Sequence, residues 1–355
     1  MARLCRRAVI LLATAGWATL GWATAGWAEE SAEPPGLQVP VDCRLGVDCF
    51  IQNYMDVDPG PEAVDYACGA LANPGHRGTD FRVRDLNDVA RGVPVLAAAA
   101  GTVVGARDGM ADGFPDEVTS NDIEGRECGN GVVLDHGGGW RTQYCHLRQG
   151  SLTVAHGDRL EAGDQIGQIG MSGLAEFPHL HLSVWQGNHA VDPFLGPGAP
   201  GASGASGSSG ASGAPEGCRG PRHPLWRADA ERRLTYQARG VLNAGFAAVE
   251  PDLRGVERGA YRDEPPDRHS SLWFYVRLFG VQAGDRQRLR VFGPRGRLVM
   301  EWTSEPAAST EILWLQPIGR QAPEDGWPAG RYRGEFLLLR RGAVVLDALA
   351  ETEIR

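Results

Sequence analysis

The sequence predicts a mainly β protein with two folded parts. Short apolar runs separated by glycine-containing turns occur on both sides of residues 196–217, and no long stretch shows the 3.6-residue periodicity of a helix. Residues 196–217 themselves are almost wholly Gly, Ala, Ser and Pro, a composition that cannot bury a core and behaves as a flexible linker. A length of 355 residues is consistent with two domains and additional segments.

The first 28 residues have the pattern of an export signal. Three arginines (Arg3, Arg6 and Arg7) precede an uncharged stretch that ends in Gly26-Trp27-Ala28, where the small residues suit cleavage. The alternative is an uncleaved membrane anchor, for which this Ala-, Gly- and Thr-rich stretch is weak. We therefore expect a periplasmic or secreted protein with no stable membrane span after cleavage. Loss of the three arginines would change the formal charge from −9 to −12.

Six cysteines remain once Cys5 of the signal is set aside. An even number in an exported chain favours disulfides, and the absence of a Cys-x-x-Cys pair argues against thiolate metal or redox sites. The preferred pairs among the 15 connectivities are Cys43–Cys49, Cys68–Cys218 and Cys128–Cys145. The last pair has the best support, because 132–134 and 142–144 are expected to be neighbouring strands joined by a glycine turn.

Strand signals divide the chain further. Residues 29–66 are rich in Pro, Asp and Cys and are expected to form an N-terminal extension without a core. Apolar runs at 93–96, 101–104, 131–134, 165–169 and 180–185 predict a mainly β domain over residues 67–195. Runs at 272–278, 288–292, 311–315, 332–339 and 344–346 predict an immunoglobulin-like β-sandwich over residues 218–355, whose partner the sequence does not identify.

The basic residues exclude several functions. All 35 are arginine, so a phosphate-binding P-loop lysine, a Schiff-base lysine and a Ser-Lys dyad are impossible. The net negative charge disfavours binding to nucleic acid.

Histidines and one aspartate have the spacing of a metal site. His76 and Asp80 are four residues apart, and His179 and His181 alternate so that on a strand both face one side. Catalytic zinc commonly takes three His or carboxylate ligands and keeps one position open. His76, Asp80 and one histidine of the pair would satisfy this need. The other histidine of the pair and His146 would remain for proton transfer.

These motifs occur together in an order that resembles the lysostaphin/LytM-type zinc metallopeptidases. The order is His76-x-x-x-Asp80, Tyr144-x-His146-Leu147 and Pro178-His179-Leu180-His181, followed by Val191-Asp192-Pro193, and the resemblance covers about residues 75–195. It implies an antiparallel β-sheet with an open groove and one Zn²⁺ per chain held by His76, Asp80 and His181. It also implies that His146 and His179 are the catalytic pair.

The resemblance further implies a peptidoglycan hydrolase that cuts stem peptides or cross-links. The alternative is a non-catalytic envelope scaffold or an activator of other cell-wall hydrolases, because some members of this superfamily have lost ligands. All five positions are filled here, which favours an enzyme. The extension that contains Asn53 and Asp58 could also fold over the metal and block it, as pro-segments of related enzymes do.

Two further features are expected to be structural or solvated. His136 precedes a turn and is expected to be structural, whereas His156 and His189 are expected to lie in loops and to be solvated. Residues 108–127 contain seven acidic residues and one arginine. They are interpreted as a solvated loop, with a groove wall that attracts a substrate amine as the alternative.

Overall fold

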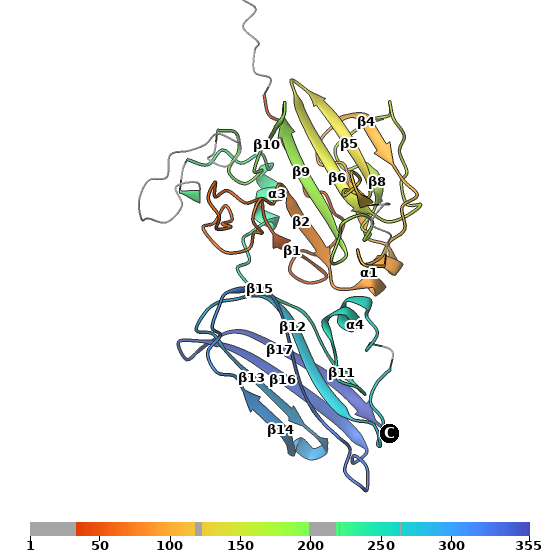
Figure 1. Cartoon of the computed structure of the whole chain (residues 1–355), viewed down its shortest axis with the longest axis vertical. Coiled ribbons are helices and arrows are strands. Elements are labelled where there is room, and N and C mark those ends of the chain that lie inside the picture. Colours follow the sequence, from red (N-terminus) through yellow and green to blue (C-terminus); the bar gives the residue numbers. More distant parts are fainter. Residues whose placement is uncertain (1–32, 118–122, 199–217, 220, 263) are drawn as a thin grey trace, which may run out of the picture. The chain divides into compact units, whose positions relative to one another are not determined.

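The computed structural model describes residues 33–117, 123–198, 218–219, 221–262 and 264–355 (Figure 1). Glu33–Arg355 form one compact unit. The expected signal peptide and most of the expected linker lie outside the described residues. Within the described ranges, none of the helices has the length and apolar character needed to cross a membrane.

One antiparallel sheet of eight strands carries the candidate site. Its order is β1-β2-β9-β6-β5-β4-β7, with β10 paired to β9. The strands are β1 (Cys49–Asn53), β2 (Thr79–Val83), β4 (Gly101–Arg107), β5 (Asn130–Gly137), β6 (Trp140–Leu147), β7 (Arg159–Leu160), β9 (His179–Gln186) and β10 (His189–Ala190). A separate ladder joins β3 (Pro94–Leu96) to β8 (Gln165–Gln168), and α1 (Leu86–Arg91) follows β2. The expectation of a mainly β fold is confirmed.

The hairpin β5–β6 supports the centre of this sheet. Gly137, Gly138 and Gly139 all have positive φ, which glycine adopts without strain, and they reverse the chain between the two strands. Cys128 and Cys145 are bonded across this hairpin, and Cys43–Cys49 and Cys68–Cys218 are the other two disulfides. The preferred cysteine pairing is confirmed.

The expectation that residues 29–66 contribute no core is wrong. β1 is fully buried and pairs with β2 at one edge of the main sheet. Leu37, Val41 and Tyr54 are 0 to 1% exposed and belong to the main apolar core. These apolar residues are scattered between prolines and aspartates, so local periodicity does not reveal a segment that is buried by partners distant in sequence.

The C-terminal part is a sandwich of two antiparallel sheets (Figure 1). One has the order β11-β12-β15 and the other β14-β13-β16-β17. The elements are α3 (Ala228–Arg233), β11 (Gly240–Ala247), α4 (Leu253–Arg258), β12 (Leu272–Val281), β13 (Arg286–Phe292), the 3₁₀ turn η2 (Pro294–Gly296), β14 (Leu298–Thr303), β15 (Glu311–Arg320), β16 (Gly330–Arg340) and β17 (Ala343–Ile354). The expected sandwich is present, whereas its immunoglobulin-like classification stays a prediction. Its fourth strand pairs with the third, and in a constant-type immunoglobulin domain it lies beside the fifth.

Residues after the expected linker also belong to the main core. Leu225, Trp226, Ala230 and Leu234 are buried in the same cluster as the strands of the eight-stranded sheet. Leu37 exchanges backbone hydrogen bonds with Leu225 and Arg227. Segment 218–236 therefore packs on the N-terminal part, and the predicted boundaries between the two domains stay a prediction.

Candidate metal centre

The site lies on one face of the main sheet where β2, β9 and β6 are neighbours. Asp80 on β2 is directly opposite His181 on β9, and Arg82 is opposite His179. Opposed residues of an antiparallel pair share a face, as do residues two apart on one strand, so Asp80, His179 and His181 point to the same side. His76 reaches this face from the loop before β2. His146 reaches it from the end of β6.

Three side chains converge closely enough to share one ion. His181 Nδ1 is 2.8 Å from Asp80 Oδ1, and His76 Nε2 is 3.2 Å from both of these atoms. Ligand atoms bound tetrahedrally at about 2.1 Å from zinc lie roughly 3.4 Å apart, so the observed spacing is close to that of a bound set. His76, Asp80 and His181 could therefore hold a metal ion.

The remaining polar atoms of these three residues are held by other groups. His76 Nδ1 donates to Tyr54 O at 2.7 Å, His181 Nε2 lies 3.0 Å from Ser183 Oγ, and Asp80 Oδ2 accepts from Asn53 Nδ2 at 2.9 Å. Such contacts orient metal ligands and select the imidazole tautomer. The site therefore turns one nitrogen of each ring and one carboxylate oxygen toward a common point, and this donor set fits Zn²⁺.

The electrostatics of the site favour a cation. Burial lowers the pKa of His76, but the neighbouring Asp80 carboxylate outweighs burial and raises this pKa to about 9. Burial raises the pKa of Asp80, and the surrounding histidines reverse this and hold it well below the usual range. Asp80 therefore remains ionised and stabilises positive charge at the point where the three ligand atoms meet.

The other two histidines lie beside this cluster, and burial favours the neutral form of each ring. Burial lowers the pKa of His146 well below its usual value, and burial also lowers that of His179. Their ring centres are 4.6 Å apart, and His179 Nε2 is 3.6 Å from Asp80 Oδ1. Each Nδ1 donates to a carbonyl 2.7 Å away, Ser172 O for His146 and Phe177 O for His179. In these tautomers each Nε2 has a free lone pair that can accept a proton.

All five sequence-predicted residues are thus near one another, whereas several supporting groups were not predicted. Ser183 could have been recognised from its place two residues after His181 on the same strand face. Asn53 was singled out only as a possible block. The carbonyls of Tyr54, Ser172 and Phe177 carry no side-chain signal, because any residue supplies a carbonyl.

The other residues considered from the sequence have structural contacts. His136 is bonded to Ala100 O at 2.7 Å and Thr142 Oγ1 at 2.8 Å, which fits the expected structural role. Cys43, Asp48 and Cys49 also lie close together, but both cysteines are in a disulfide and cannot act as thiolate ligands. In the acidic segment, Asp112 accepts from Met171 N and Gln149 N. Asp122 lies outside the described residues.

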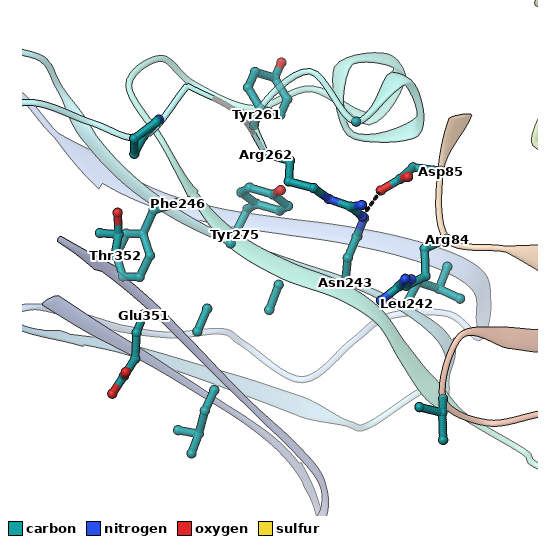
Figure 2. A pocket seen from close by; sticks show the side chains of 17 residues that line it. Arg84, Asp85, Leu242, Asn243, Phe246, Tyr261, Arg262, Tyr275, Glu351 and Thr352 are labelled. Carbon is teal, nitrogen blue, oxygen red and sulfur yellow. Dashed lines mark hydrogen bonds and ion pairs between the residues drawn. The ribbon is translucent and has the colours of Figure 1, made fainter. Parts of the chain in front are cut away.

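A cavity of about 470 Å³ lies away from these histidines (Figure 2). It is lined on one side by Arg84 and Asp85, which form the β2–α1 corner, and on the other by residues of the sandwich. Its lining includes Asp85, Asn243, Tyr261, Arg262 and Tyr275. Figure 2 shows Arg262 extended toward Asp85, with which it forms an ion pair at 2.5 Å. None of the five candidate site residues lines this cavity.

Comparison with known families and proteins gives matches over the same region. Residues 74–193 match the model of peptidase family M23. The chain is 33% identical over 118 residues to an uncharacterized metalloprotease of Haemophilus influenzae and 31% identical over 109 residues to the peptidoglycan DD-endopeptidase ShyA of Vibrio cholerae. These alignments cover 33% and 31% of this chain, and each spans only 20% of the relative's length.

Solved structures match a similar share of the chain. A zinc-containing peptidase of Vibrio cholerae is 24% identical with a TM-score of 0.31, and the match covers 45% of this chain and 39% of that one. The catalytic domain of lysostaphin from Staphylococcus simulans is 29% identical with a TM-score of 0.25, covering 34% of this chain and 78% of that one. The resemblance to the lysostaphin/LytM-type metallopeptidases is confirmed for residues 74–193, the part of the chain that matches peptidase family M23.

Proposed function

We propose that the protein is a zinc-dependent endopeptidase that hydrolyses peptide bonds in the stem peptides or cross-links of peptidoglycan. His76, Asp80 and His181 hold one Zn²⁺ per chain, and His146 and His179 form the catalytic pair. The single observation that carries the proposal is the meeting of three potential ligand atoms within 4.8 Å of one another, beside two buried imidazoles. The similarity to a peptidoglycan DD-endopeptidase supports the choice of substrate.

The roles of the side chains follow from their protonation states. When bound, Zn²⁺ supplies a Lewis acid that polarises a carbonyl oxygen and makes a nearby water more acidic. His146 and His179 present neutral Nε2 atoms, so either can take the proton of the attacking water and pass it to the leaving amine. Before it passes this proton on, the protonated ring would also stabilise the oxyanion that develops on the scissile carbonyl.

A periplasmic or secreted location fits this function. Three disulfides form and persist in an oxidising compartment, where peptidoglycan is also accessible. The predicted signal peptide would direct the chain there.

The test is digestion of purified peptidoglycan by the zinc-loaded protein, with mass analysis of the released fragments. We expect new peptide termini that disappear with a chelator, return with zinc, and are absent with His146→Ala. His189→Ala is the matched control, because His189 is an exposed histidine on β10 outside the site. This control should release the same fragments at the wild-type rate.

The rival function is a non-catalytic scaffold or activator of other wall hydrolases. It would be favoured if the protein binds one equivalent of zinc and leaves the wall intact, while a second hydrolase digests it faster in its presence. Equal digestion by the wild type and His146→Ala would instead overturn the assigned role of His146.

A further inference from the structure

We propose that Glu257 of α4, in the C-terminal part, is a positioning residue for His179 and acts through Arg82 and Phe177. This rests on the proposed function, in which His179 is one of the catalytic pair. The sandwich would then be part of the support of the active site and more than a tethered accessory domain.

The first link is a buried ion cluster between the two parts of the chain. Arg82 Nη2 on β2 donates to Glu257 Oε1 at 3.0 Å and Oε2 at 2.9 Å, and the two side chains are 0% and 3% exposed. Arg277 of β12 also forms an ion pair with Glu257. Without Glu257, two guanidinium groups would be left buried without this carboxylate, which is strongly unfavourable.

The second link joins Arg82 to the histidine. Arg82 lies opposite His179 in the β2–β9 ladder, on the same face as Asp80. Its guanidinium carbon is 4.6 Å from the centre of the Phe177 ring, and that ring is 4.5 Å from the His179 ring at an interplanar angle of 33°. The carbonyl of Phe177 also accepts from His179 Nδ1 at 2.7 Å. Arg82 therefore contacts Phe177, the residue that fixes both the ring plane and the tautomer of His179.

The third link is the attachment of α4 itself, which fixes Glu257. Asp252 caps the helix through Gly255 N at 2.8 Å, and Arg254 binds both carboxylate oxygens of Asp116 at 2.7 Å. After the helix, Arg262 pairs with Asp85 of the β2–α1 corner, as Figure 2 shows. A short helix held at both ends allows Glu257 little movement. Because the side chains of Glu257 and Arg82 are both buried, a change at the Glu257 carboxylate would shift the Arg82 guanidinium.

The experiment compares the full chain with Glu257→Gln, which keeps the size and one acceptor but removes the charge. We expect kcat on a peptidoglycan peptide to fall between about tenfold and a hundredfold, as a small misplacement of a reacting group produces, with KM and zinc stoichiometry unchanged. The matched control is Asp285→Asn. Asp285 is also a buried carboxylate, and its partner Arg340 lies in the sandwich on β16. We expect this control to retain the wild-type kcat.

A readout that does not need activity is the NMR signal of the His179 ring nitrogens. We expect the Nδ1–H signal to shift or broaden in Glu257→Gln and to stay unchanged in Asp285→Asn. If Glu257→Gln fails to fold, Phe177→Leu tests the next link and should give the same shift. The Glu257 effect on kcat should also disappear in a His179→Ala background, since a double-mutant cycle isolates coupled residues.

An unchanged His179 signal in folded Glu257→Gln would overturn the inference even if the protein digests peptidoglycan. A wild-type chain without any hydrolytic activity would instead overturn the proposed function, while the NMR comparison would still decide the coupling.

Discussion

The backbone at His146 has a φ of +62°, a left-handed conformation that residues other than glycine rarely adopt. Its amide donates to Cys128 O at 2.8 Å, and its ring donates to Ser172 O, so both the backbone and the side chain are held. Unfavourable conformations of this kind persist where the surroundings fix them, and they are common at active sites. The orientation of this catalytic candidate therefore depends on contacts made by its neighbours.

Asn53 provides a test of whether the contacts of a metal ligand control metal binding. Its amide holds Asp80 Oδ2, and its own Oδ1 is buried without a hydrogen-bond partner. We expect Asn53→Ala to weaken zinc binding by about 10- to 100-fold, because groups that orient metal ligands have effects of this size. Competition with a chromophoric chelator measures the affinity. Tighter binding or a faster enzyme in Asn53→Ala would instead support the idea that this segment blocks the site.

Asp192 makes the stability depend on pH. Burial raises its pKa to about 7, and its Oδ2 is buried without a hydrogen-bond partner, while Oδ1 accepts from Phe194 N and Leu195 N. The unfolded carboxyl has a pKa of about 3.9, so folding favours the protonated form. The stabilisation is complete below about pH 4 and is lost as pH rises to about 7.

The comparison of wild type with Asp192→Asn isolates this contribution. We measure the free energy of unfolding in urea at pH 4.5 and at pH 8. We expect the decrease from pH 4.5 to pH 8 to be larger in the wild type than in Asp192→Asn, by a few kcal/mol. Other titrating groups cancel in the difference. Parallel pH profiles for the two proteins would show that Asp192 remains ionised in the fold.

At the scale of elements, the Cys128–Cys145 disulfide joins the start of the β5–β6 hairpin to the residue before His146. Its separation is 17 residues, and a crosslink closing about 15 residues stabilises a fold by roughly 3 kcal/mol. We expect the double variant Cys128→Ala/Cys145→Ala to lose about 2–4 kcal/mol in chemical unfolding and to lose hydrolytic activity as His146 relaxes. Removal of Cys43–Cys49, which spans only 6 residues, is the control that should retain activity.

The acidic segment, residues 108–127, was interpreted from the sequence as a solvated loop, but two of its carboxylates pair with arginines of α4. Asp116 pairs with Arg254, and Glu117 pairs with Arg254 and Arg258, all on exposed surface. Arg254 also lies over the ring of Phe114 at 4.7 Å. These carboxylates are therefore occupied by α4 of the C-terminal part. Exposed pairs of this kind contribute little to stability, and we assign them a role only in aligning the loop and α4 with each other.

At the scale of the whole molecule, the two parts share a core and a disulfide. Cys218 is bonded to Cys68, and Leu225, Trp226 and Leu234 are at most 4% exposed in the main cluster. Each such side chain contributes roughly 1.5–3 kcal/mol when buried. We expect a fragment of residues 33–198 to melt well below the full chain or to aggregate, as followed by circular dichroism.

A longer fragment of residues 33–237 is the matched comparison. It keeps the Cys68–Cys218 bond and these apolar side chains but lacks Glu257, so it should be more stable than the shorter fragment and still leave Arg82 without its carboxylate. Equal melting temperatures for the two fragments would show that segment 218–237 adds nothing to the N-terminal core.

The sequence by itself predicted the mainly β class and the preferred disulfide pairs, and its resemblance to a peptidase family singled out the five histidine and aspartate positions of the proposed site. Strand alternation places His179 and His181 on one face regardless of the rest of the fold, and glycine turns mark the β5–β6 hairpin through a local conformational need. Strands β1, β2, β11 and β14 were not among the predicted runs. β1 and β11 were missed because their burial comes from partners far away in sequence.

Only the tertiary structure decided which groups support the site. Asn53 contacts Asp80 because β1 pairs with β2, and Glu257 reaches Arg82 across 175 residues of chain. Such contacts depend on distances in space that no local pattern records, and several of the acceptors are backbone carbonyls that every residue possesses. The chemistry of the candidate site therefore depends on a few side chains, whereas its geometry depends on the packing of the whole unit.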